Sequence, residues 1–189
     1  IWMPTISAAN HLRMAYRDNS DNPAMCPREA LGVLDAKGAI TAPVREILEI
    51  IAQHDAVLAS GHLHISEILP LFEAARAAGV RRMLVNQPPH RAGATVADIE
   101  ELARDGAFIE LIAAAFIEGP DRRHPPDVLT SVIAAASPER IVFSSGLGHT
   151  GNLKPVEGLR ALIRLCLQHG IAEEDMTMML AKNAAQLVG

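Results

Sequence analysis

Residues 56–86 read AVLASGHLHISEILPLFEAARAAGVRRMLVN, and this stretch decides the fold. It opens with a short apolar run, Ala56–Ser60, and closes with a second one, Arg82–Asn86. The segment between them has the apolar spacing of a helix, with Ser66 as its expected cap and Gly79 as its end. Apolar runs without alternation are typical of strands buried on both faces. Two such strands joined by a helix predict parallel pairing through a right-handed crossover.

The same alternation of strand and helix extends over the rest of the chain. The expected strands are Ile1–Thr5, Ala56–Ser60, Arg82–Asn86, Ala107–Ile112 and Ile141–Ser145. Besides the helix at Ser66, helices are expected from Thr41 and Pro43, from the pair Thr95 and Asp98, and over Pro125–Ala136, Pro155–His169 and Glu173–Leu187. Residues Asp18–Lys37 hold Asn, Asp, Pro and Gly with little periodicity, so we expect a long loop there.

These strand–helix units predict an α/β protein of parallel βα units and leave two architectures open. One is an open, doubly wound sheet, and the other is part of a TIM barrel, which typically needs about 250 residues. The chain has 189 residues and begins at Ile1, inside an apolar run. We therefore expect a single domain over residues 1–189 that lacks the N-terminal barrel strands. A barrel cut in this way exposes unpaired strand edges, so we also expect the chain to be a homo-oligomer or poorly soluble.

The amino-acid composition limits the kinds of binding partner that we expect. Hydrophobic residues make up 49% of the chain, which is enough for a sizeable core. Lys and Arg number 17 against 22 Asp and Glu, a net charge of −5, so charge gives no reason to expect binding to nucleic acid or an anionic membrane. No apolar run reaches the roughly 18 residues of a membrane span. The two cysteines, Cys26 and Cys166, make no disulfide framework, and we expect a cytoplasmic protein that binds a small molecule.

Polar residues gather where the expected strands end. They are Asn10, His11, His62, His64, Gln87, His90, Glu110, Ser145, Gly146 and His149. Functional residues lie at the carboxyl ends of the strands in either architecture, so these residues are the candidates for one pocket. Imidazole at such positions indicates metal binding or acid–base chemistry.

Two of these candidates, His62 and His64, are separated by one residue. If the strand before them continued, both imidazoles would face the same side and could reach one metal ion. The alternative is one inward histidine and one loop histidine that caps the helix at Ser66. The spacing alone leaves both interpretations open.

A glycine-rich loop, residues 146–151, follows the last expected strand. Its sequence GLGHTG satisfies the pattern G-x-G-x-x-G of dinucleotide-binding loops. Lys154 and Pro155 precede the next helix, and no later strand supplies an acid for the ribose. The loop therefore fits a phosphate held by backbone amides better than a dinucleotide.

The strand ends resemble the amidohydrolase superfamily of metal-dependent TIM-barrel hydrolases. The similar stretches are Trp2–Thr5 with Asn10 and His11, Ala59–His62, Met83–Pro88, Ser144–Gly148, Glu157–Leu159 and Asn183–Gly189. The resemblance implies strands four to eight of the barrel, with the first-strand His-x-His pair upstream of Ile1. It also implies metal ligands after strands five and six and an essential aspartate after strand eight. His62 matches the strand-five ligand, whereas Gln87 stands in place of the strand-six histidine and Gly146 in place of the aspartate.

These departures bear on activity. A neutral Gln amide is a poor zinc ligand, and without the aspartate the general base for metal-bound water is missing. Residues His90, Glu110 and His149 lie near the altered positions and are candidates to compensate. We expect an amidohydrolase-like protein whose ancestral chemistry is metal-dependent hydrolysis of an amide or ester, with a divalent metal (zinc or manganese) at low occupancy. The alternatives are a non-catalytic scaffold for a small anionic or polar ligand, and phosphate or nucleotide binding at residues 146–151.

Overall fold

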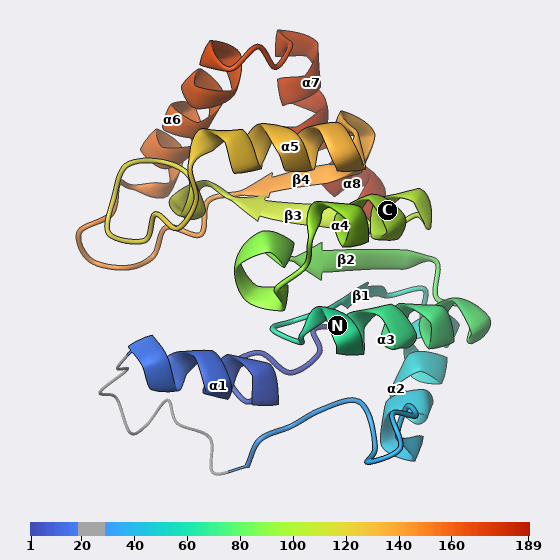
Figure 1. Cartoon of the computed structure of the whole chain (residues 1–189). Helices are drawn as coiled ribbons and strands as arrows, with labels where there is room; N and C mark the ends of the chain where they lie inside the picture. The colour runs from blue at the N-terminus through green and yellow to red at the C-terminus, as the bar shows by residue number, and fades with distance from the viewer. Residues whose placement is uncertain (19–28) are drawn as a thin grey trace. The chain divides into compact units, whose positions relative to one another are not determined.

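A computed structural model describes residues 1–18 and 29–189 (Figure 1). They form two compact units, an N-terminal unit of Ile1–Ala94 and a C-terminal unit of Thr95–Gly189. Cys26 and most of the first half of the expected loop 18–37 lie outside the described residues. None of the helices in the described ranges has the length and apolar character needed to cross a membrane.

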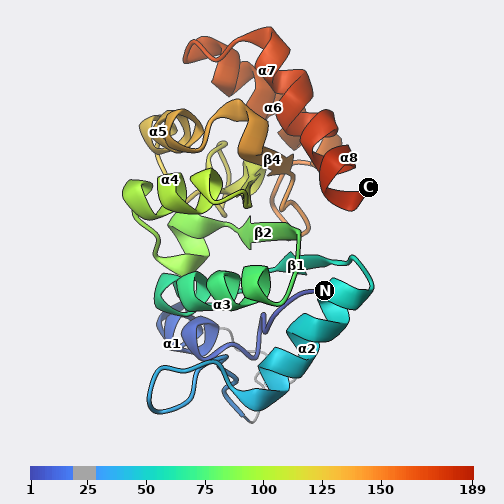
Figure 2. The same ribbon diagram turned by 90° about the vertical axis from the view of Figure 1, so that its right-hand side faces the viewer.

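The N-terminal unit is built on a parallel strand–helix–strand unit. Its elements are α1 (Ala9–Asp18), α2 (Ala42–Gln53), β1 (Val57–Ala59), α3 (Ile65–Ala77), β2 (Arg82–Asn86) and a π-helical turn, η2 (Pro88–Ala92). Strand β1 pairs in parallel with β2, with Val57 beside Arg82 and Ala59 beside Leu84. The views in Figures 1 and 2 follow the chain from β1 through α3 into β2. The prediction of two parallel strands joined by a helix is confirmed.

Helix α3 buries one continuous apolar stripe. Ile68, Leu71, Phe72 and Ala75 are all 0% exposed and follow the i, i+3, i+4, i+7 spacing of a helix face. The strands are buried too, since Leu58 of β1 and Val85 of β2 are fully enclosed. Burial on this scale is the dominant stabilising term for such a unit.

The N-terminal segment differs from the expected strand Ile1–Thr5. Only Trp2 forms a bridge, parallel to Ala59, with bonds from Met3 N to Ala59 O (2.9 Å) and from Ala59 N to Ile1 O (2.8 Å). Proline has no N–H and cannot continue the ladder, and Pro4 follows directly. Helix α1 then begins at Ala9, in a polar stretch for which no helix was predicted, so Asn10 and His11 lie in a helical first turn.

The C-terminal unit repeats the pattern with a second parallel pair. Its elements are α4 (Val96–Arg104), β3 (Phe108–Ile112), η3 (Ala113–Ala115), α5 (Pro126–Ala136), η4 (Pro138–Arg140), β4 (Ile141–Ser144), α6 (Pro155–Gln168), α7 (Glu173–Thr177), η5 (Met178–Lys182) and α8 (Asn183–Val188). Strands β3 and β4 are parallel, with Ile112 beside Ser144. The α/β class with parallel βα units therefore holds in both units.

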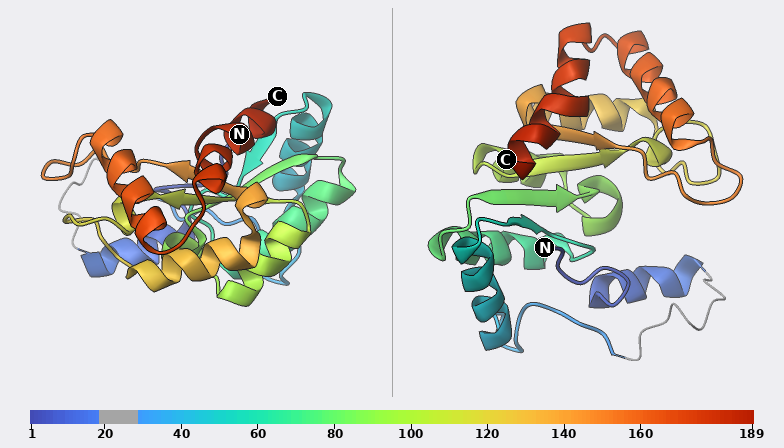
Figure 3. Two further views of the ribbon diagram at one scale, coloured as in Figure 1. Left: turned by 90° about the horizontal axis from the view of Figure 1, so that it is seen from above. Right: turned by 180° about the vertical axis from the view of Figure 1, so that it is seen from behind.

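The C-terminal helical run departs from the single helix expected over Glu173–Leu187. It contains a π-helical turn, η5, between α7 and α8. Directly after this turn, the buried Asn183 donates to Pro138 O (2.7 Å) and Ile141 O (2.6 Å) at the start of β4. Helix α8 contacts β4. Figure 3 shows the C-terminal helical run, in red, from two further directions.

Two predicted helix caps have different outcomes. The pair Thr95 and Asp98 forms the expected reciprocal capping box at the start of α4. The cap of α3 is His64 and not Ser66, because the helix begins one residue before the serine, at Ile65. A histidine ring nitrogen accepts the bond that a serine hydroxyl was expected to accept.

Candidate functional site

The carboxyl end of β1 is fixed by buried polar groups. Gly61 has a left-handed φ of 62°, and its N–H donates to Asn86 Oδ1 at 2.9 Å. Asn86 is fully buried, and its own N–H donates to Ser60 Oγ at 2.9 Å. These two bonds connect the carboxyl ends of β1 and β2, immediately before the residues that follow each strand.

Gly61 also permits a close backbone approach. A Cβ at this position would lie 2.4 Å from Met3 O and 2.5 Å from Pro4 O, which no side chain tolerates. The next residue, His62, donates its backbone N–H to Pro4 O at 3.0 Å. The glycine therefore lets the N-terminal segment pass the end of β1, and this passage sets the position of His62.

His62 faces His11 of α1. Their Nδ1 atoms are 2.8 Å apart, and the rings stack with centroids 4.8 Å apart and planes inclined by 24°. Burial lowers the pKa of His62 to about 4, with a further contribution from the charge of Arg91. Burial and Arg91 also lower the pKa of His11. We call His11 and His62 the histidine pair; at neutral pH both rings are neutral, and one donates its N–H to the other.

Asn10 holds the surroundings of the histidine pair in place. Its side chain is 6% exposed, and Nδ2 donates to the backbone oxygens of His62 (3.0 Å) and Arg91 (2.8 Å). One amide thus connects the start of α1, the loop after β1 and η2. Arg91 was not among the candidate residues, although a cation in the loop after a strand is a signal that could have identified it.

His64 lies in a different set of contacts. Its Nδ1 accepts from Ser66 N at 3.3 Å and is 2.9 Å from Ser66 Oγ, while its backbone N–H donates to Glu67 Oε2. This is the helix-capping alternative for the His62–His64 spacing. The strand ends at Ala59, so the two histidines do not continue a ladder, and their rings have different contacts, His62 with His11 and His64 with Ser66.

The loop after β2 carries two further candidates. Gln87 has a left-handed φ of 48° and precedes η2, and its carbonyl accepts from the backbone N–H groups of His90 (3.0 Å) and Arg91 (2.8 Å). The charge of His90 makes the smallest contribution to the lowered pKa of His62. Gln87, which stands where the resemblance implies the strand-six metal ligand, therefore helps to form the turn that carries Arg91.

In the C-terminal unit, Glu110 lies inside the parallel pair. It is 9% exposed and accepts from Ser144 Oγ of the neighbouring strand at 2.7 Å. Gly146 follows β4 with a φ of 60°, and a Cβ there would lie 2.9 Å from the side chain of Ile112. A side chain at position 146, where the resemblance implies an aspartate, is thus disfavoured by the backbone conformation and by the nearby Ile112 side chain.

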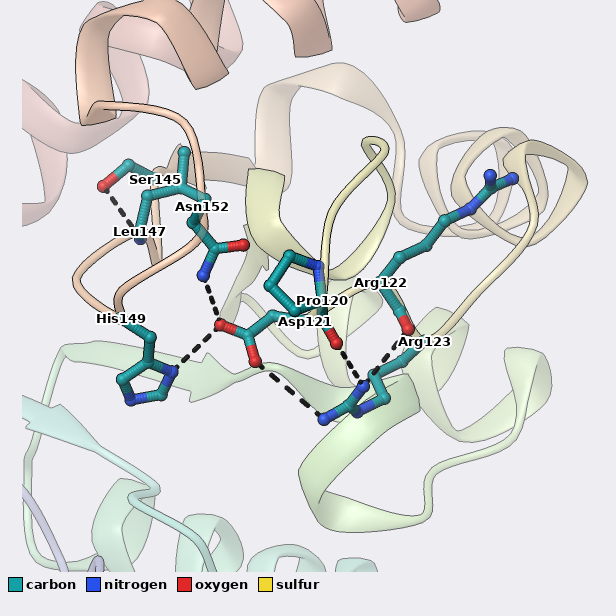
Figure 4. Close-up of polar contacts among 8 residues, drawn as sticks. All are labelled: Pro120, Asp121, Arg122, Arg123, Ser145, Leu147, His149 and Asn152. Atoms are coloured by element: carbon teal, nitrogen blue, oxygen red, sulfur yellow. Dashed lines mark hydrogen bonds and ion pairs between the residues drawn. The ribbon is translucent and has the colours of Figure 1, made fainter.

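The remaining candidates, Ser145 and His149, lie in the loop between β4 and α6 (Figure 4). His149 Nδ1 is 2.9 Å from Asp121 Oδ2, and Asn152 Nδ2 donates to the same oxygen at 2.6 Å. Burial would raise the pKa of Asp121, but the bonds from Asn152 and His149 outweigh it and hold that pKa below its ordinary value. Ser145 Oγ accepts from Leu147 N within the loop. Asp121 was not a candidate, and it anchors this loop.

Whether a metal ion fits this site depends on the side chains available as its ligands. Within residues 1–18 and 29–189, no group of three or more His, Cys, Asp or Glu side chains is arranged to hold an ion. The histidine pair offers two imidazole nitrogens, and ordinary catalytic zinc sites use three protein ligands. The described residues therefore do not complete a catalytic zinc site.

Comparison with solved structures identifies the fold. An amidohydrolase from Burkholderia multivorans with bound zinc is 13% identical, with a TM-score of 0.55 over 99% of this chain and 72% of that chain. Its crystal form with bound HEPES gives 12% identity and a TM-score of 0.54 over 97% and 71%. A Pseudomonas putida protein assigned as a 2-pyrone-4,6-dicarboxylic acid hydrolase gives 13% identity and a TM-score of 0.54 over 98% and 70%.

The class that these observations define is an α/β protein with an amidohydrolase fold. Residues 1–110 match the model of a family of unknown function, DUF6282, and the chain belongs to that family. No curated protein matches the sequence. The matched residues include the whole histidine pair with Asn10 and Arg91.

Proposed function

We propose that this chain is an amidohydrolase-like protein that binds a small anionic molecule, such as a carboxylate, beside the histidine pair. The observation that carries the proposal is the Asn10 amide, which donates to both His62 O (3.0 Å) and Arg91 O (2.8 Å) and so holds the backbone of Arg91 beside that of His62. The charge of Arg91 lowers the pKa of both His11 and His62. Burial is the largest cause of the lowered pKa of His62, and the charge of Arg91 adds to it. An anion in this place is attracted by the guanidinium and by the ring N–H that the pair presents after taking up a proton.

The barrel register is part of the same proposal. We assign the Ile1–Met3 segment and strands β1 to β4 to strands four to eight of a TIM barrel. Support comes from the parallel pairing within each unit and from the likeness to amidohydrolases over 97–99% of this chain. In this register the histidine pair follows strands four and five, and Gln87 and Gly146 replace metal-site residues of the ancestral hydrolase.

Anion binding and protonation of His62 are coupled in this site. An anion that favours the charged imidazole raises the pKa of His62 from about 4, and by linkage the anion binds more tightly as pH falls. The test is side-chain nitrogen NMR of His62 across pH, with benzoate as the probe and benzamide as its uncharged counterpart. Benzoate should raise the pKa of His62 by about one unit, a differential interaction of about 1.4 kcal/mol, and benzamide should not.

Two variants make this test specific. Arg91→Gln should remove the response to benzoate, whereas Arg81→Gln should keep it, because Arg81 is an exposed residue that pairs with Asp55. A response that survives Arg91→Gln, or equal responses to benzoate and benzamide, would contradict the proposal.

The second candidate function is metal-dependent hydrolysis of an amide or ester. It is favoured by one observation, the two neutral imidazole nitrogens that already face each other, since neutral imidazole is the form that binds metal. The test is elemental analysis after dialysis against buffered zinc or manganese. We expect well below one ion per chain, because two ligands are too few. One tightly held ion per chain would favour the hydrolase instead and direct attention to His90 as a further ligand.

A further inference from the structure

The C-terminal unit contains a pocket whose lining residues are not among the site residues described above. It has a volume of about 300 Å³, within the range of small-molecule sites. One wall is a single face of α6, formed by Ala161, Arg164, Leu165 and Gln168 at the i, i+3, i+4, i+7 spacing. Phe116, Ile117, Pro126 and Leu153 supply the remaining apolar lining.

The walls of this pocket, the α6 pocket, are mainly apolar. Phe116 and Ile117 are buried, and Leu153 is 46% exposed. An exposed leucine beside buried aromatic and aliphatic groups offers apolar surface that a ligand would remove from water. The shape and lining therefore suit the hydrocarbon part of a small molecule.

The two cations of the pocket differ in their partners. Arg122 pairs with Glu118, which also lines the pocket, and its Nε bonds to His124 O. Arg164 has no ion pair or hydrogen bond within the part of the chain that the structure describes, whereas Arg160, one turn away on α6, pairs with Glu157. The charge of Arg164 at the edge of an apolar pocket is therefore available to an anionic group.

We propose that the α6 pocket binds a small amphiphilic anion, with a hydrocarbon body against Phe116, Ile117 and Leu165 and a carboxylate at Arg164. The geometry requires one negative charge next to a compact apolar body, which distinguishes this ligand from an inorganic anion or a neutral lipid. It requires no residue of the histidine pair, so it stands independently of the function proposed above.

Octanoate is the probe for this site, and 1-octanol is its uncharged counterpart. Isothermal titration of the Arg91→Gln protein, in which the site beside the histidine pair is removed, should show one octanoate bound per chain and at least tenfold weaker binding of 1-octanol. Backbone NMR of the unaltered protein should place the octanoate-induced shifts at Leu153, Ala161 and Leu165. Shifts confined to the neighbourhood of Arg91, or no binding at millimolar octanoate, would overturn the proposal.

Three variants test the roles of charge and volume. Arg164→Gln should weaken octanoate binding about tenfold and leave 1-octanol unchanged, and Arg160→Gln is the matched control that should change neither. Ala161→Phe should fill the pocket and abolish binding of both probes. If Ala161→Phe fails to fold, Ala161→Leu serves the same purpose with less added volume. Equal octanoate affinity in the Arg164→Gln and Arg160→Gln proteins would contradict the assignment of Arg164.

Discussion

The Nδ1 atoms of His11 and His62 lie 2.8 Å apart across 51 residues of sequence. At that distance one nitrogen donates and the other accepts, so protonation of both rings breaks the contact. Burial and the charge of Arg91 act in the same direction on both rings. The pair is therefore a neutral unit at physiological pH, and its protonation is linked to the stability of the N-terminal unit.

The first prediction concerns pH. The pKa of His62 is about 4 in the folded chain and 6.5 for an ordinary histidine, so between these values the unfolded chain binds a proton that the folded chain does not. The free energy of unfolding therefore has its full value above pH 6.5 and decreases as the pH falls from 6.5 toward 4. Discounted for partial exposure, the loss is about 2 kcal/mol. Urea unfolding between pH 7.5 and 4 measures it.

The control for this pH effect is another histidine. His62→Gln should flatten the pH dependence of the free energy of unfolding, because Gln does not titrate. His169→Gln should leave the pH dependence as it is, since His169 is an exposed residue at the end of α6. Identical pH profiles for the wild type and His62→Gln would contradict the prediction.

The second prediction concerns Gly61. Gly61→Ala introduces a Cβ 2.4 Å from Met3 O at a left-handed φ, so it should destabilise the fold by about 3 kcal/mol. Gly38→Ala is the matched control, because Gly38 also has a positive φ but has nothing within 4 Å of its Cβ position. It should cost only about 1 kcal/mol. Chemical denaturation of both variants gives the comparison, and equal losses would show that the close approach at Met3 is unimportant.

The third prediction concerns the contact of α6 with the preceding loop. A Cβ at Gly158 would lie 1.9 Å from Leu147 Cδ1, and Leu147 is only 7% exposed. Gly158→Ala should therefore destabilise the protein by about 2 kcal/mol, despite the higher helix propensity of alanine. Gly148→Ala has open space and should change stability by less than about 0.5 kcal/mol. Thermal unfolding of the pair measures the difference; a stabilised Gly158→Ala protein would show that Leu147 repacks freely.

The fourth prediction concerns Asp121. Asp121→Ala removes the acceptor shared by His149 and Asn152, so the loop over residues 146–152 should open more often. Hydrogen exchange at the Asn152 amide should accelerate about tenfold, equivalent to about 1.4 kcal/mol. Arg123→Gln is the control, because Arg123 reaches Asp121 only at 3.9 Å and should leave the exchange rate nearly unchanged. Equal protection in Asp121→Ala and the wild type would mean that the loop is held by other contacts.

The fifth prediction concerns self-association, which remains an expectation from the sequence. Ile1 and Trp2, beside β1, are 60% and 56% exposed. Exposed apolar residues on a strand-like segment favour pairing with another chain. Sedimentation velocity should show an oligomer that shifts toward monomer in Trp2→Lys, while Val188→Lys, a change at an exposed residue near the other end of the chain, should have no effect. A wild-type monomer at all concentrations would contradict this expectation.

Local signals in the sequence were sufficient for most of the fold. The bounds of β2 agree with the expected strand Arg82–Asn86, and the capping box of Thr95 and Asp98 is present. Both depend on neighbours within a few residues, where propensity and hydrogen-bond geometry act directly. Helix α1 was missed because its first turn carries Asn10 and His11, polar residues that resemble a loop when their distant partners are unknown.

The candidate site was only partly predictable for the same reason. His62 and His11 were separate candidates, and nothing in their spacing indicated that their rings would meet. That contact depends on the passage of the N-terminal segment beside Gly61, which is a long-range packing event. Arg91 and Asp121 were missed because a single charged residue in a loop is indistinguishable from solvated surface until its neighbours are known.

Asn10 suggests how this framework could be altered. Its amide donates only to main-chain oxygens, those of His62 and Arg91, so the bonds do not depend on which side chains stand at positions 62 and 91. Successive substitutions at those two positions could therefore change the chemistry of the site while the backbone that presents it stays the same. For protein engineering, positions 62 and 91 are therefore the ones to vary, and Asn10 is the residue that should be kept.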